Sequence, residues 1–243
     1  MLKKIMLSIV AVLVLAVAGT LGWMSVPFAY QHEATASALV STEQVQVIQD
    51  EFISFAPVHS TPDKGILFYP GGKTSAATFA PLMRRFAEQG YLAVIVPMPF
   101  NTAFLGISKA DQVVAAFPAV QHWVIAGHSL GGVAAVEYVK SADLSRFKGL
   151  LLLASYPASD ISQLAIAVKS ISGSQDSQST PQKINDNKPK LPSATDYVVI
   201  DNANHWQFGS FAAEHSTEQG LISATDQAEQ VFRQSLTFLQ MVL

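Results

Sequence analysis

The sequence predicts an α/β protein with a doubly wound, mostly parallel β-sheet, helices on both faces and no large lid domain. From Gly65 onward, segments of strand character alternate with segments of helix character, and this alternation is typical of α/β domains. Several expected strands are continuous apolar runs, such as residues 150–153 (LLLL). Such runs indicate strands that are buried on both faces, as in a parallel sheet covered by helices.

The individual elements follow from local patterns. Alternation in residues 45–55 (VQVIQDEFISF) predicts two short strands around Gln49 and Asp50. Further strands are expected over residues 65–69, 91–98, 122–127, 147–155, 167–173 and 195–201. Helices are expected over residues 75–90, 108–117, 129–140 and 224–243. Little chain separates Ser155 from Ala167, which leaves no room for a large lid.

A long uncharged segment follows Lys3 and Lys4 and extends from Ile5 to Gln31. It exceeds the apolar centre of about 7–15 residues in a secretory signal and reaches the roughly 20 residues that a spanning helix needs. No further Lys or Arg occurs until Lys64, so the positive charges place the N-terminus in the cytoplasm.

Small residues at positions 34–38 (ATASA) also fit a signal-cleavage site. We therefore expect a transmembrane anchor or signal segment over residues 1–31, a linker over residues 32–43 and the main domain over residues 44–243. The main domain is expected outside the cytoplasm, either anchored in the membrane or, after cleavage, secreted or periplasmic.

Composition excludes several kinds of function. The 243 residues carry a formal net charge of -3 and include no Cys. The length suits one domain of generous size. A mildly acidic chain without a basic patch gives no electrostatic basis for nucleic-acid binding. The lack of Cys excludes disulfides, thiolate catalysis and thiolate metal sites.

Residues 127–132 (GHSLGG) match G-x-S-x-G between an expected strand and an expected helix. In this setting Ser129 occupies a sharp, strained turn, and Gly127 and Gly131 lack the Cβ atoms that would collide across it. The amide of Leu130, at the helix N-terminus, points toward a developing oxyanion. The pattern predicts Ser129 as a nucleophile. The alternative is a glycine-rich turn that only packs the helix on the sheet.

A serine nucleophile needs a base, and the base needs an orienting acid. On this kind of turn the chain order is Ser, acid, His. Of six His residues, only His205 and His215 follow Ser129. His205 comes just after the last expected strand, at the sheet edge where open α/β sheets place their sites. We predict His205 as the base and expect His215 on the solvated surface.

The acid must lie between Ser129 and His205. The candidates are Glu137, Asp143, Asp160, Asp176, Asp186, Asp196 and Asp201. We predict Asp176, in the loop after the penultimate strand, and keep Asp160, which follows the preceding strand, as the alternative. An Asp in such a loop can also simply cap a turn.

Residues 68–74 (FYPGGKT) form another glycine turn between an expected strand and an expected helix. Free amides in such a turn favour an anion. A nucleotide-binding phosphate loop would require glycine five positions before Gly72, where this chain has Leu67. A phosphate-wrapping role is therefore not expected.

These motifs, with MPF at 98–100, ISGSQD at 171–176 and NANHWQFG at 202–209, resemble those of α/β-hydrolases. They are most similar to the small dienelactone-hydrolase-like branch, which includes membrane-anchored bacterial members. The likeness covers about residues 44–242. The resemblance implies Ser129 as nucleophile, Asp176 as acid and His205 as base, and an oxyanion donor from the turn at residues 70–72.

One departure from that branch matters. Dienelactone hydrolase itself uses a cysteine nucleophile, and this chain has no Cys. The lactone substrate is therefore not implied.

We expect a serine hydrolase that cleaves an ester-like bond in a small molecule through an acyl-enzyme, without a metal or cofactor and without a nucleic-acid partner. The amides of Leu130 and Gly72 are expected to bind the oxyanion. The expected pocket residues are Gly71, His128, Phe100 and Trp206, with Phe104, Leu105 and Phe208 as further apolar candidates. Alternatives are an acyltransferase on the same triad and a non-catalytic binding module on the same fold.

Overall fold

The computed structural model describes residues 2–215 and 221–243, and its sheet has eight strands in the order β1-β2-β4-β3-β5-β6-β7-β8. The strands are β1 Val45–Gln49, β2 Ile53–Pro57, β3 Lys64–Tyr69, β4 Leu92–Ile95, β5 His122–His128, β6 Phe147–Leu153, β7 Ala167–Gly173 and β8 Asp196–Ile200. Strands β3 to β8 are parallel, whereas β2 pairs antiparallel with β4 and with β1. The mostly parallel sheet is confirmed.

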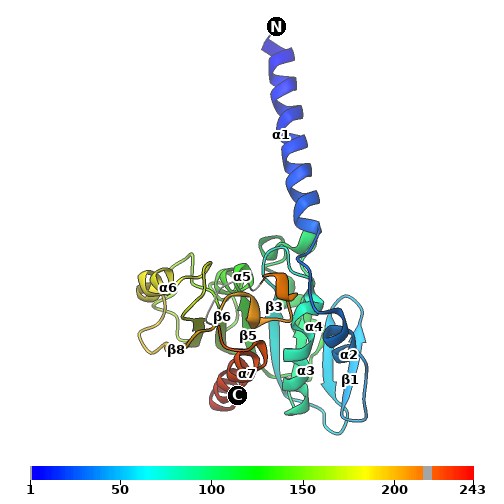
Figure 1. Ribbon diagram of the computed structural model, residues 1–243, viewed down its shortest axis with the longest axis vertical. Helices are drawn as coiled ribbons and strands as arrows, with labels where there is room; N and C mark the ends of the chain where they lie inside the picture. Colours follow the sequence, from blue (N-terminus) through cyan, green and yellow to red (C-terminus); the bar gives the residue numbers. More distant parts are fainter. Residues whose placement is uncertain (1, 216–220) are drawn as a thin grey trace.

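Helices cover both faces of the sheet (Figure 1). They are α1 Leu2–Ser25, α2 His32–Ala38, α3 Ala80–Glu88, α4 Lys109–Ala116, α5 Leu130–Val139, α6 Pro181–Asn187 and α7 Ala224–Val242. Short 3₁₀ turns are η1 Ala76–Phe79, η2 Pro99–Asn101, η3 Ala103–Leu105, η4 Lys188–Lys190, η5 Trp206–Phe208 and η6 Ala213–His215. Residues 154–166, between β6 and β7, form no helix or strand and no large lid.

Alternate residues of the central strands face two separate cores. In β3, Ile66 and Phe68 belong to the core that includes side chains of α3 and α7. The intervening Leu67 and Tyr69 belong to the core that includes side chains of α4 and α5. All four are essentially inaccessible to solvent. Burial on both sides explains why the strands read as continuous apolar runs.

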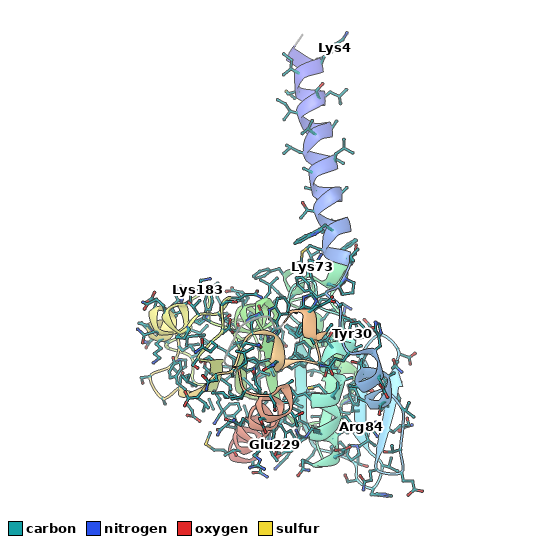
Figure 2. All side chains as sticks on the ribbon, viewed as in Figure 1. Lys4, Tyr30, Lys73, Arg84, Lys183 and Glu229 are labelled. Atoms are coloured by element: carbon teal, nitrogen blue, oxygen red, sulfur yellow. The ribbon has the colours of Figure 1, made fainter. Side chains whose placement is uncertain are left out.

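The N-terminal helix α1 projects away from the domain as a straight rod (Figure 1). Among the described helices, α1 alone is long and apolar enough to cross a membrane by length and composition, and its apolar window is not buried in the protein. In Figure 2, Lys4 marks its far end and Lys73 lies at its base.

The linker predicted over residues 32–43 differs from the structure, because its first part forms helix α2. Thr35 and Ala38 are buried there, and the helix contacts α3. Arg84 of α3 donates a hydrogen bond to the carbonyl of Ala38 at 3.0 Å. The small residues that suggested a linker instead allow close packing against α3, and Arg84 satisfies a carbonyl at the helix end.

Candidate active site

Ser129 follows β5 directly and precedes the first residue of α5. Its backbone angles are φ 51° and ψ −123°, a strained conformation for a residue with a side chain. The turn is held because the Ser129 amide donates to the carbonyl of Leu153 at 3.0 Å. A Cβ on Gly131 would lie 2.0 Å from the Tyr69 carbonyl oxygen, and one on Gly127 would lie 2.4 Å from the Gly131 backbone. The sharp turn therefore requires both glycines.

His205 and Asp176 come together at the carboxyl ends of β8 and β7. His205 Nδ1 lies 2.9 Å from Asp176 Oδ2, and both side chains are buried. The other carboxylate oxygen, Oδ1, accepts hydrogen bonds from the amides of Gln178 at 2.8 Å and Ser179 at 2.7 Å. These contacts satisfy a buried carboxylate, which would otherwise be costly. The contact of the carboxylate oxygen Oδ2 with His205 makes Nδ1 the donor and leaves Nε2 to accept a proton.

The sheet edge brings Ser129 and His205 to one small cavity of about 30 Å³. This cavity is lined by Phe28, Gly71, Gly72, Thr74, His128, Ser129, Gln178, His205, Trp206 and Phe211. A second cavity of about 460 Å³ also borders Ser129. It is lined by Ser129, Leu130, Val133, Ser155, Tyr156, Ser177, Gln178, Ser179 and Lys183. Ser129 and Gln178 are common to both linings.

Two backbone amides are available beside Ser129. Leu130 is the first residue of α5, and Gly72 lines the small cavity with Ser129. None of the hydrogen bonds among the described residues uses either amide. Free amides at a helix N-terminus and in a glycine turn favour negative charge.

His128 supports the loop that carries His205. Its Nε2 lies 3.1 Å from the carbonyl oxygen of His205 and donates to it. The two imidazole rings also pack, with centroids 4.6 Å apart. Burial lowers the pKa of His128 well below its ordinary value, and the nearby His205 lowers that pKa further. His128 is therefore a neutral ring that positions the His205 backbone.

This lowered pKa predicts acid sensitivity. The unfolded chain binds a proton at His128 near pH 6.5, whereas the folded chain does so only at lower pH. The unfolded state thus binds more protons, and the free energy of unfolding falls as pH drops below about 6.5, by at most about 1.4 kcal/mol per pH unit. His128→Gln, which keeps a donor for the His205 carbonyl, is expected to lose part of this dependence. Urea unfolding at several pH values measures it, and identical pH slopes for both proteins would contradict the expectation.

The two alternative residues lie elsewhere. Asp160 is exposed, and its Oδ1 caps the amide of Ser162 at 2.8 Å, a backbone hydrogen bond that lowers the pKa of the Asp160 carboxyl. His215 was expected on the solvated surface, but its ring stacks on Trp206 with centroids 4.8 Å apart. Its side chain is only 20% exposed. His215 thus belongs to the aromatic wall near the small cavity, while the contact with Asp176 belongs to His205.

The predicted pocket residues divide into two groups. Gly71, His128 and Trp206 line the small cavity. Phe100 does not line either cavity at Ser129; it is 50% exposed on the surface of η2. Its φ of 51° lies outside the helical range. Among the other apolar candidates, Phe104 and Leu105 are exposed as well.

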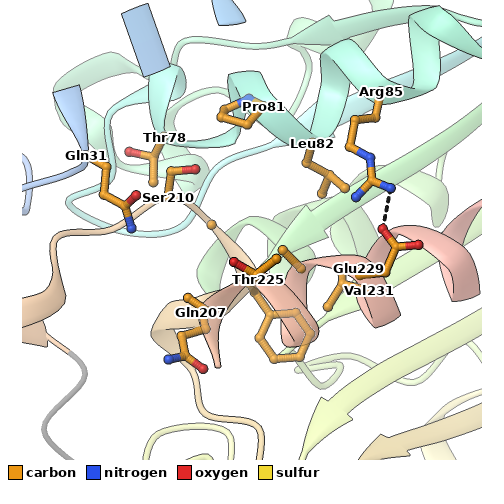
Figure 3. A pocket seen from close by; sticks show the side chains of 14 residues that line it. Gln31, Thr78, Pro81, Leu82, Arg85, Gln207, Ser210, Thr225, Glu229 and Val231 are labelled. Atoms are coloured by element: carbon orange, nitrogen blue, oxygen red, sulfur yellow. Dashed lines mark hydrogen bonds and ion pairs between the residues drawn. The ribbon is translucent and has the colours of Figure 1, made fainter. Parts of the chain in front are cut away.

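Phe208, the remaining apolar candidate, lines a different cavity, of about 310 Å³. Figure 3 shows this cavity with the ion pair between Arg85 of α3 and Glu229 of α7 at one end and Gln31 and Thr78 at the other. It contains none of Ser129, Asp176 and His205.

Sequence reasoning missed some residues of the site. Phe28 lines the small cavity although it precedes Ser129 by about a hundred positions. Ser155 Oγ donates to the carbonyl of Ser129 at 2.7 Å. Gln178, which lines both cavities, is the one missed residue that the sequence could have indicated, because it lies two positions after Asp176. Within residues 2–215 and 221–243, no group of three or more His, Asp or Glu side chains is arranged to hold a metal.

Comparisons with known structures agree with this fold. TT1662 from Thermus thermophilus is 14% identical, with a TM-score of 0.60 over 81% of this chain and 97% of that chain. Thermogutta terrifontis esterase 2 phosphonylated by cyclosarin is 16% identical, with a TM-score of 0.57 over 82% of this chain and 94% of that chain. The same esterase with butyrate bound is 15% identical, with a TM-score of 0.57. At these identities the likeness shows the fold alone.

No curated protein matched the sequence significantly. The sequence profile of the alpha/beta hydrolase family, in contrast, matches residues 65–229, which is more than half of the chain. With its parallel sheet and the turn at Ser129, the chain belongs to the alpha/beta hydrolase family.

Proposed function

We propose that the protein is a serine hydrolase that cleaves carboxylic esters or related acyl bonds through a triad of Ser129, His205 and Asp176. The observation that carries the proposal is the buried 2.9 Å contact between His205 Nδ1 and Asp176 Oδ2, beside a cavity that His205 shares with the strained Ser129. A nucleophile on a strained turn, a base and an acid orienting that base are the parts that acyl transfer requires. The esterases of similar fold support the choice of an ester bond.

The first half of the reaction forms an acyl-enzyme. Ser129 Oγ attacks the carbonyl carbon while His205 Nε2 takes the hydroxyl proton, and Asp176 stabilises the imidazolium that results. The oxyanion accepts hydrogen bonds from the amides of Leu130 and Gly72. The tetrahedral intermediate then collapses: the bond to the leaving oxygen breaks, and His205 gives its proton to that oxygen.

The second half of the reaction releases the acid. Water attacks the acyl carbon while His205 Nε2 takes one of its protons, the bond to Ser129 Oγ breaks, and the proton returns to Ser129. The products are a carboxylic acid and an alcohol. Every proton transfer uses His205, and water is the second reactant.

Hydrolysis of p-nitrophenyl acetate by the purified full chain tests the proposal. We expect saturable release of p-nitrophenol, with a rate that is lost on treatment with a fluorophosphonate. A rate no higher than that of buffer, in a protein shown to be folded by circular dichroism, would refute the proposed activity.

Asp176→Asn is expected to reduce kcat by roughly 10⁴-fold, because the amide no longer fixes the His205 tautomer or stabilises the imidazolium. Asp160→Asn is a matched control, since Asp160 is exposed and caps only its own turn. We expect it to retain near wild-type kcat. Steady-state kinetics of both variants decide between the two acids, and a large loss in Asp160→Asn with little loss in Asp176→Asn would reverse the assignment.

A further inference from the structure

The C-terminal end of α1 is held directly by the catalytic domain. Lys73 Nζ donates to the carbonyl of Trp23 at 3.0 Å. Asn101 Nδ2 donates to the carbonyls of Met24 at 3.3 Å and Ser25 at 2.9 Å. The last carbonyls of a helix have no partner within the helix, and a cation there complements the helix dipole. The domain thus supplies the C-terminal cap of α1.

The residues that form this cap are strained. Lys73 and Asn101 have φ angles of 53° and 49°, which cost energy for residues with side chains. A hydrogen bond of 2.9 Å from the Lys73 amide to the Asn101 carbonyl joins them, and the Phe28 amide donates to the Lys73 carbonyl at 2.7 Å. These bonds compensate the strain and leave only residues 26–27 between α1 and the domain. The helix is seated on the domain and is not attached through a flexible linker.

The cap adjoins the reacting groups. Gly72, next to Lys73 in the chain, lines the cavity with Ser129, and a Cβ built on Gly72 would lie 3.7 Å from Met24 Cε. The 24 residues of α1 span about 36 Å, slightly more than the roughly 30 Å hydrocarbon core of a bilayer. If α1 spans the bilayer, its seated end reaches the headgroup region, and the Ser129 edge of the sheet lies against the membrane surface.

Exposed apolar side chains lie just after α1 and in η2, which contacts α1, and in the adjoining η3. Val26, Phe100, Phe104 and Leu105, here called the apolar rim, are 64%, 50%, 44% and 52% exposed. Val26 directly follows α1, and the other three residues lie in η2 and η3, which follow β4. Turn η3 also contacts the nucleophile helix α5. Figure 1 shows α1 rising from this side of the domain, with the C-terminus of α7 on the opposite side. A cluster of exposed apolar residues marks an interaction surface, and its continuity with α1 indicates a lipid partner.

The two cavities define what can react there. The small cavity beside His205 measures about 30 Å³, so it leaves no room for a long acyl chain and admits at most a short acyl group. The cavity of about 460 Å³ is lined largely by polar side chains, and Lys183 is the one charged residue among its described lining residues. This cavity suits a polar, uncharged or anionic group on the alcohol side of the ester.

We propose that the apolar rim rests in the surface of the bilayer that α1 spans, and that the site cleaves short acyl groups from the polar headgroups of membrane-resident amphiphiles. The hydrocarbon chains of the substrate stay in the bilayer, and the headgroup ester enters the polar cavity. The inference rests on the proposed hydrolase activity and on α1 as the membrane anchor.

The first test measures membrane contact without using activity. The chain has no Cys, so Leu105→Cys gives a single labelling site for an environment-sensitive dye. The matched control is Val58→Cys, which is 50% exposed and follows β2 at the opposite edge of the sheet. In full-length protein reconstituted in phosphatidylcholine vesicles, we expect a blue shift and quenching by lipid-borne quenchers at position 105 only. Water-like emission at both positions would overturn the membrane contact.

The second test measures the substrate class. It compares p-nitrophenyl acetate with a tailed ester, which is the acetate of a p-nitrophenol that carries a hexadecyloxy chain. The tailed ester is incorporated in the vesicles. We expect the tailed ester to have the higher kcat/KM. Phe104→Ser/Leu105→Ser should lower the rate on the tailed ester by roughly threefold to tenfold and leave the soluble ester unchanged. Val58→Ser/Met241→Ser, which alters two exposed residues away from the rim, should change neither rate.

The outcomes separate the two proposals. No hydrolysis of either ester refutes the hydrolase activity itself. Hydrolysis of the soluble ester without preference for the tailed one, or equal rates on the tailed ester for the rim and control variants, overturns the membrane-substrate inference alone.

Discussion

Ser129→Ala is expected to reduce kcat for p-nitrophenyl acetate by roughly 10⁶-fold, to the level that binding and the oxyanion amides alone provide. The substitution removes the atom that forms the acyl-enzyme, and no other described serine has φ in the left-handed range. The fold should persist, because the bonds that hold the turn use only backbone atoms of Ser129: its amide donates to the Leu153 carbonyl, and its carbonyl accepts from Ser155 Oγ.

Ser145→Ala provides the control. Ser145 is exposed and precedes β6, at the edge of the sheet opposite Ser129. We expect wild-type kinetics for this variant and the same thermal unfolding midpoint for all three proteins. Residual activity of Ser129→Ala above about one hundredth of wild type would show that another group is the nucleophile.

His205→Ala is expected to cause a loss of similar size, again roughly 10⁶-fold in kcat, since every proton transfer in the proposed reaction uses His205. His215→Ala is its matched control. Both residues follow Ser129 in the chain and both contact Trp206, so loss of aromatic packing affects either variant. Of these two histidines, only His205 contacts Asp176. We expect His215→Ala to retain kcat within a few-fold of wild type.

A pH profile adds a second readout for this pair. The His215→Ala profile should keep the shape of the wild-type profile. If His215→Ala abolishes turnover while His205→Ala does not, the base has been assigned to the wrong residue, and the contact with Asp176 would then be structural.

Much of the fold could be predicted because burial on both faces leaves a clear pattern. The parallel strands from β3 to β8 follow from apolar runs, β1 and β2 follow from alternation, and the order of these strands in the chain is confirmed. Helix α6 was not expected, because its sequence PQKINDN is polar. It forms because Thr180 caps the amide of Lys183 and Pro181 occupies the first turn. Helix α2 depends on packing against α3, a long-range contact that local pattern does not contain.

The candidate site was likewise predictable only in part. Chain order and strand ends predicted that Ser129, Asp176 and His205 lie at one edge of the sheet, because parallel strands deliver their carboxyl ends to one edge; the structure has the contact between Asp176 and His205 and a cavity lined by both Ser129 and His205. Side-chain direction in loops could not be predicted: Phe100 is 50% exposed and lines neither cavity at Ser129. The role of Lys73 was also missed. It caps α1 and lies over the ring of Trp23, with Nζ 3.9 Å from the ring centroid. That contact joins residues fifty positions apart.

The central claim is that Ser129 is the nucleophile of a serine hydrolase, and covalent trapping tests it most directly. The full-length protein is treated with a fluorophosphonate, digested and analysed by tandem mass spectrometry. We predict one phosphonyl adduct, on Ser129, that is absent from Ser129→Ala and strongly reduced in His205→Ala. An adduct on a different residue, or equal labelling of wild type and Ser129→Ala, would contradict the claim.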